Sequence, residues 1–225
     1  MSTTNSLIQL VSHLLESGSM EEREAWLSTS VVGRRNVVPF LMKRICAPDQ
    51  DRTDVRMSLL LLGMVVGLVG QSGSSEQKST VFANLSSVET FWQTIGGILC
   101  AVDSSGGTKS ACLSLLLAAH RLGASPDWPM RIHSTDYLTK AIELLESDRT
   151  CIGRNRLVGF TFLLSAYASV PARVVALLRQ SGVKRSVVEL AQQLTFSMAF
   201  AMDAPTRGLL DLKLGAQLAQ AVDDS

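Results

Sequence analysis

The fold of this protein is decided by residues 36–69, which have the sequence NVVPFLMKRICAPDQDRTDVRMSLLLLGMVVGLV. The segment predicts two helices, over 36–46 and 52–69, separated by the charged turn APDQD. The second helix is apolar on nearly every side, which is typical of a central helix covered by several neighbours. The first helix is more amphipathic, so we expect it to lie outside its partner.

The same order of a first helix, a short turn and a more apolar second helix recurs three times. The predicted pairs are 87–102 with 108–122, 135–146 with 153–169, and 171–180 with 184–202. Helices over 6–16 and 20–28 precede the pairs, and a last helix over 205–222 follows them. We therefore predict an all-α protein of about ten helices without a sheet. Its packed hairpins would form either an α-solenoid or a compact bundle.

Residues with known preferences for helix ends agree with this partition. N-caps are expected at Ser19 and Ser134. Pro171 and Pro205 stand where the first helical residue is expected, a position that tolerates proline. Three glycines just past apolar helices are expected to act as left-handed caps: Gly70, Gly123 and Gly182.

The chain length of 225 residues suits one helical domain over 1–225. Hydrophobic residues make up 46% of the chain but aromatic residues only 5%, a balance that favours helices over a β-sandwich. Two segments are predicted as connectors, the polar 71–80 (QSGSSEQKST) and the proline-broken 123–133 (GASPDWPMRIH). A boundary between subdomains would fall at one of these two segments.

The unit 36–69 resembles an armadillo- or HEAT-type helical repeat. It has a short helix ending in two apolar residues, a charged turn with Asp, and a long helix beginning Val55-Arg56. The segment 172–194 (ARVVALLRQSGVKRSVVELAQQL) is similar, and at the level of pattern the resemblance covers about residues 34–202. It implies solenoid-like stacking. However, the steps between the corresponding Leu59, Leu115, Leu163 and Leu194 are 56, 48 and 31 residues, whereas such repeats keep a period of ~40–47. A non-repetitive bundle therefore stays the alternative.

Several features predict a cytoplasmic protein. The N-terminus lacks the basic and apolar regions of a signal peptide. The longest uncharged apolar run, 57–70, falls short of the ~18 residues that span a bilayer, so no transmembrane segment is expected. The four cysteines form no CxxC pair and are expected mostly as buried free thiols: Cys46, Cys100, Cys112 and Cys151.

No motif predicts catalysis, a metal or a cofactor. The stretch 103–110 (DSSGGTKS) is close to a phosphate-binding loop, but Thr108 separates Gly107 from Lys109, so we interpret it as a turn between helices. The three histidines are far apart and lack acids at metal-ligand spacing. No serine or cysteine lies in a nucleophile motif. The protein is therefore predicted not to be an enzyme.

The most informative feature is the distribution of charge. The net charge is only +1, yet residues 149–188 hold seven basic residues and no acid, and residues 1–30 carry a local charge of −3. We expect a basic edge for partner binding, built from Arg149, Arg154, Arg156, Arg179, Lys184 and Arg185. Arginine suits carboxylate and phosphate, so the predicted function is a non-enzymatic interaction protein that binds an acidic protein segment or nucleic acid. An anionic lipid surface would suit the edge too.

Two alternatives stay open. In the first, the basic residues form a solvated face and pair with acids elsewhere in the fold, such as Glu143, Glu146 and Glu189. In the second, the acidic N-terminal arm and the basic C-terminal half support head-to-tail self-assembly. The protein would then be a structural component, broadly similar to the helical matrix and nucleocapsid proteins of RNA viruses.

Overall fold

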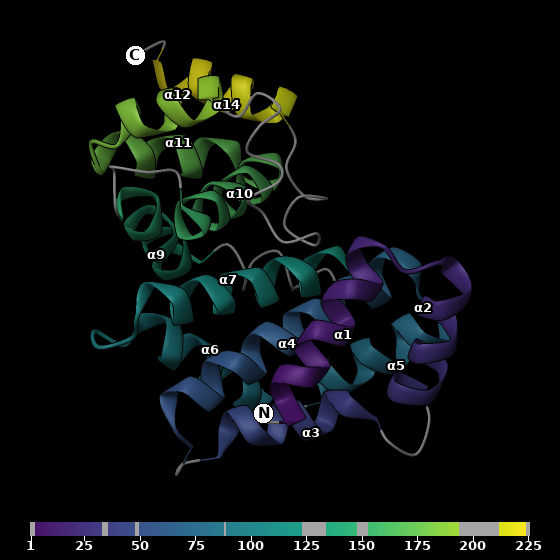
Figure 1. Cartoon of the computed structure of the whole chain (residues 1–225). Helices are drawn as coiled ribbons and strands as arrows, with labels where there is room; N and C mark the ends of the chain where they lie inside the picture. The colour runs from purple at the N-terminus through teal and green to yellow at the C-terminus, as the bar shows by residue number, and fades with distance from the viewer. Residues whose placement is uncertain are drawn as a thin grey trace.

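Figure 1 shows a computed structural model of the whole chain, which describes residues 3–32, 36–47, 50–87, 89–122, 134–147, 153–193 and 212–223. Within these ranges the chain forms twelve α-helices, one π-helical turn and no strand. The predicted all-α fold class and the predicted number of about ten helices are both confirmed.

The four predicted helix pairs are also confirmed. They are α3 (Val37–Cys46) with α4 (Arg52–Ser72), α6 (Glu89–Cys100) with α7 (Gly106–Arg121), α9 (Thr135–Glu146) with α10 (Arg154–Ser169), and α11 (Pro171–Gln180) with α12 (Lys184–Gln193). Residues 194–202 of the last predicted helix lie outside the described residues.

Further helices flank the pairs at both ends. The predicted N-terminal helices correspond to α1 (Thr3–Glu16) and α2 (Met20–Leu27), and α2 continues into a π-helical turn, η1 (Ser28–Val32). The last predicted helix corresponds to α14 (Leu212–Asp223), while residues 205–211 lie outside the described residues.

The second helices of the pairs form the centre of the fold. α7 packs along α4 on one side and against α10 on the other, so the three helices contact one another in series. The first helices make a parallel series of contacts, α3 with α6, α6 with α9, and α9 with α11. At the two ends, α1 packs on α4, and α14 packs on α10, α11 and α12. Helices α4, α7 and α10 are each covered from several sides. This coverage explains why they are apolar on nearly every side.

Most of the predicted helix ends are confirmed. Ser19 and Glu22 form a capping box in which each side chain accepts a hydrogen bond from the other's backbone N–H. Ser134 caps α9, Pro171 begins α11, and Gly182 has a φ of +66°. The predicted cap at Gly70 is wrong because α4 continues to Ser72. Gly123 and Pro205 lie outside the described residues.

The predicted polar loop over 71–80 is wrong, because α5 (Ser75–Ser86) begins within it. Ser74 and Gln77 form a capping box at its start. One side of α5 is buried through Gln77, Val81 and Leu85, a spacing of four residues. The helix is polar elsewhere, so composition alone indicated a loop. The other predicted connector, 123–133, lies outside the described residues.

Helix α4 is long and apolar enough to cross a membrane by length and composition, with a mean hydropathy of 1.6 in its most apolar window. Half of that window is buried inside the protein, where α1, α3 and α7 pack on the helix. This burial accounts for the apolar composition and is consistent with the prediction that the chain has no transmembrane segment.

The close packing of α9 on α10 can be tested at Gly159. A Cβ atom there would lie 2.6 Å from the backbone oxygen of Ala141 and 3.1 Å from the nitrogen of Leu145. Gly159→Ala should therefore lower the free energy of unfolding by about 2 kcal/mol, because forced overpacking outweighs the gain in helix propensity. The matched control is Gly70→Ala, whose Cβ would meet nothing within 4 Å, and which should raise stability by up to about 1 kcal/mol. Urea unfolding followed by circular dichroism measures both. Equal changes in the free energy of unfolding for the two variants would contradict the close packing of α9 on α10 at Gly159.

Candidate functional site

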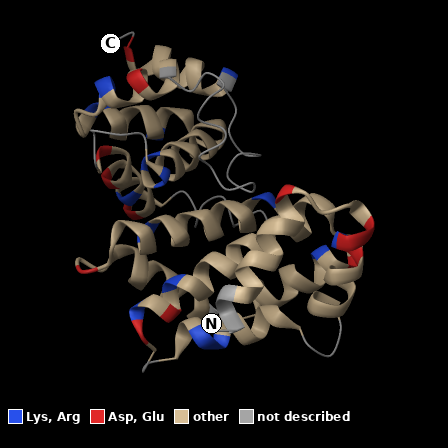
Figure 2. Ribbon diagram, viewed as in Figure 1, with Lys and Arg blue, Asp and Glu red and all other residues tan. Residues whose placement is uncertain are grey.

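The four hairpins turn at one edge of the molecule, which we call the turn edge. It consists of the ends of α3, α6, α9 and α11 and the beginnings of α4, α7, α10 and α12, on the left side of Figure 1. Charged residues of both signs lie along this side (Figure 2). The edge therefore brings together charged groups from four separate parts of the chain.

The first and second hairpins are joined at the turn edge by an ion pair. Arg52, the first residue of α4, binds the carboxylate of Asp103, which lies between α6 and α7. A second bond runs from its guanidinium to the Asp103 backbone oxygen at 3.4 Å. Within the first hairpin, Arg44 and Asp54 form a further pair at 2.9 Å. These acids neutralise part of the positive charge near the start of α4.

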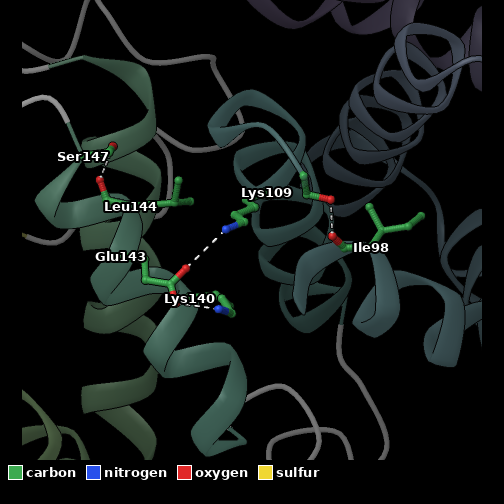
Figure 3. A network of polar contacts seen from close by, with 7 residues as sticks. Ile98, Lys109, Lys140, Glu143, Leu144 and Ser147 are labelled. Atoms are coloured by element: carbon green, nitrogen blue, oxygen red, sulfur yellow. Dashed lines mark hydrogen bonds and ion pairs between the residues drawn. The ribbon is translucent and has the colours of Figure 1, made fainter. Parts of the chain in front are cut away.

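The second and third hairpins are joined by a carboxylate held between two lysines (Figure 3). Glu143 of α9 accepts bonds from Lys109 of α7 at 3.3 Å and from Lys140 of its own helix at 2.5 Å. Partial burial tends to raise the pKa of Glu143, but the two lysines outweigh it and hold that pKa below its ordinary value. Beside this network, the Ser147 hydroxyl donates to the Leu144 oxygen at 2.7 Å.

The start of α7 lies at the centre of the turn edge. Ser105 caps the helix, and the two glycines that follow allow neighbouring helices to approach closely. A Cβ on Gly106 would lie 3.0 Å from the side-chain nitrogen of Asn155 in α10, and one on Gly107 would lie 3.2 Å from the guanidinium carbon of Arg56 in α4. The stretch 103–110 is thus the turn and first helical residues of α7, as the sequence predicted.

The predicted basic edge is only partly exposed. Arg154, the first residue of α10, is exposed, and Arg149 lies outside the described residues. Arg156 is only 5% exposed, and its Nε donates to the backbone oxygen of Leu145 at 2.9 Å. The expectation that Arg156 lines a binding surface is therefore corrected. This side chain satisfies a carbonyl near the end of α9, where helices leave such groups without internal partners.

Two more residues of the predicted basic edge hold the C-terminal helix. Arg179 donates to the backbone oxygen of Ala221 at 3.0 Å. Lys184 binds the backbone oxygen of Asp223 at 2.9 Å and its carboxylate at 3.0 Å. Cations are favourable at a helix C-terminus, so both residues cap α14. Arg185, 89% exposed, pairs with Glu189 one helical turn later at 2.6 Å.

These contacts bear on the alternative in which the basic residues form a solvated face and pair with acids elsewhere in the fold. Glu189 pairs with a residue of the predicted basic edge, as the solvated-face alternative proposed, whereas Glu143 pairs with Lys109 and Lys140 instead. Arg56 and Lys109 lie outside the continuous basic stretch 149–188, so a count of charge along the sequence does not select them. The recurrence of the hairpin turns was the signal that could have found them.

The described cysteines and histidines do not gather into a site. Cys112 is buried, and burial raises the pKa of its thiol to about 12. Cys46 and Cys100 are exposed, so the prediction of buried thiols is wrong for these two, and Cys151 lies outside the described residues. Burial lowers the pKa of His120. Among the described residues, no group of three or more His, Cys, Asp or Glu could hold a metal ion.

The chain matches no protein-family model, no curated protein and no solved structure.

The link between the second and third hairpins predicts a dependence of stability on pH. Because the pKa of Glu143 is depressed in the folded state, its contribution is present above the ordinary value of 4.5 and is lost as the pH falls below it. Glu143→Gln should therefore be most destabilising at neutral pH, and its deficit relative to wild type should shrink toward about pH 3. Urea unfolding of both proteins across this range measures the deficit. A deficit that stays constant with pH would contradict the assignment.

The buried Arg156 predicts a second effect on stability. Arg156→Met keeps much of the apolar stem but removes the donor to Leu145, so we expect a loss of about 2 kcal/mol. The control is Arg121→Met, an exposed arginine at the end of α7, which should change stability by less than about 0.5 kcal/mol. Thermal unfolding of the two variants distinguishes them, and a similar melting temperature for both would show that Arg156 is not needed by the fold.

Proposed function

We propose that this protein is a non-enzymatic interaction protein whose turn edge binds an acidic segment of a protein partner. One observation carries the proposal: exposed arginines from three different hairpins lie at this edge, at or near the beginnings of α4, α10 and α12. They are Arg56, Arg154 and Arg185.

The positive character of the edge comes from its side chains, because the helix termini cancel. The partial positive charges at the beginnings of α4, α7, α10 and α12 lie at the same edge as the partial negative charges at the ends of α3, α6, α9 and α11. Arg56 lies against the first turn of α7 and forms no hydrogen bond or ion pair with a described residue, so its guanidinium is open to a carboxylate. Arginine binds carboxylates in a bidentate manner, which suits selective recognition.

The mixed charge of the edge favours a protein partner over nucleic acid. Asp103, Glu143 and Glu189 lie among the cations and pair with some of them. A nucleic-acid backbone presents only negative charge and would be repelled by these carboxylates, whereas a protein segment can present basic groups to them. An edge that carries charges of both signs therefore fits a protein segment in which acidic residues are interspersed with basic and neutral ones.

Charge reversal at the centre of the edge tests this proposal. Arg56→Glu with Arg154→Glu changes two exposed residues that flank the start of α7, without touching Arg156 or Lys184, which the fold uses. The probes are a labelled peptide in which glutamates are interspersed with lysines and neutral residues, and a single-stranded RNA of equal net charge, followed by fluorescence anisotropy at low and high salt. The wild type should bind the peptide more tightly, and the double variant should lose at least about tenfold in affinity.

The matched control reverses the same amount of charge elsewhere. Lys78→Glu with Arg121→Glu alters α5 and the far end of α7, and should leave the peptide affinity within about twofold. The proposal is wrong if the wild type does not bind the peptide at low salt, or if both double variants lose affinity equally. Tighter binding of the RNA would reassign the edge to nucleic acid.

A further inference from the structure

A small pocket lies on the surface of the N-terminal part, away from the start of α7. It has a volume of about 250 Å³ and opens between α3, the end of α5 and the beginning of α6. Its lining includes Pro39, Met42, Lys43, Cys46, Thr90 and Phe91. The volume is below the roughly 300–1,000 Å³ of most small-molecule sites, so the pocket suits a single side chain.

The rim of the pocket indicates the chemistry of that side chain. Phe40, three residues before Lys43 on α3, is 56% exposed, so a large apolar group lies on the helix surface next to that lysine. Lys43 is exposed and forms no hydrogen bond or ion pair with a described residue. An apolar side chain with carboxylates beside it would fill the pocket and also pair with the lysine.

Helix α2 presents such a group. Met20, its first residue, is 62% exposed, and the exposed Glu24 lies one turn further along the same side of the helix, three residues after the exposed Glu21. Neither Glu21 nor Glu24 forms a hydrogen bond or ion pair with a described residue, while Glu22 is occupied in the capping box. Figure 2 shows acidic residues gathered at this helix.

We propose that Met20 of one molecule enters the pocket of a second copy, with Glu21 and Glu24 pairing with Lys43. Helix α2 contributes nothing to the pocket lining, and Figure 1 shows α2 and α3 at different corners of the N-terminal part. The two surfaces therefore join separate molecules head to tail, a contact that extends into open chains unless the rotation closes a ring. The pocket borders the turn edge, because Cys46 is the last residue of α3, but it uses none of the arginines of the proposed function, so this inference does not rest on that proposal.

The choice of methionine fits a contact of this kind. Its unbranched, polarizable side chain adapts to irregular apolar gaps. One side chain and surface ion pairs make an interface well below the ~1,200 Å² of stable complexes. The association should therefore be weak in solution, appear at high protein concentration, and weaken as salt screens the ion pairs.

Sedimentation velocity over about 10 µM to about 1 mM tests the contact. The wild type should rise above the chain mass of 24.3 kDa with concentration. Met20→Ser and Lys43→Glu should each stay at that mass, because each removes one side of the contact. Leu10→Ser, another exposed apolar residue, and Arg121→Glu are the controls and should associate like the wild type. Circular dichroism verifies that all four variants are folded.

Mixing Met20→Ser with Lys43→Glu, each of which lacks one side of the contact, gives the sharper test. Met20→Ser retains an intact pocket and Lys43→Glu retains an intact α2 surface, so an equimolar mixture should form a one-to-one complex of about twice the chain mass and nothing larger. The inference is overturned if the wild type stays at 24.3 kDa throughout, or if the mixture shows no complex. It is also overturned if association is lost in Arg56→Glu with Arg154→Glu but survives in Lys43→Glu, since α2 would then bind the turn edge.

Discussion

The structure depends on the packing of three apolar helices, α4, α7 and α10, in series. Each buries residues on several sides, so none of them can face water, and the remaining helices must cover them. Glycines permit close approaches between helices: Gly63 packs on the backbone of Leu115, and Gly159 lies against the backbone oxygen of Ala141. The first helix of each hairpin and the terminal helices α1 and α14 then form the outer cover.

This packing also explains why the turn edge is charged. The three central helices begin at the same edge, so their N-termini lie near one another and favour acids in the preceding turns. Asp51 caps α4, and Asp103 lies in the turn before α7. Asp103 attracts Arg52 of the first hairpin across one junction, and Glu143, an acid of α9, attracts Lys109 of α7 across the next. The charge on this edge therefore follows from the fold, and a partner would meet only the cations that the fold leaves exposed.

Apolar periodicity predicted the hairpins because burial on several sides requires long runs of Leu, Val and Ala. The same reasoning missed α5, whose buried side has only three members and whose start is polar. It also placed Arg156 on the surface. A local charge count cannot anticipate that a guanidinium will reach a carbonyl of the preceding helix, or that Arg179 and Lys184 will cap a helix some forty residues later. Those partners are set by tertiary packing.

Two of the reactive groups are shielded by burial, whereas the Cys46 thiol is exposed and lines the pocket with Lys43. Burial keeps the Cys112 thiol protonated and disfavours the charged form of His120, so neither supplies an ion at neutral pH. The charges without a described internal partner include Arg56 at the turn edge, Lys43 beside the pocket, and Glu21 on α2. Under the proposed function, exposed charges of both signs are the groups that a partner would contact. Because the fold leaves these charges without a described internal partner, water solvates them in the free protein and they are available to a partner or to another copy of the chain.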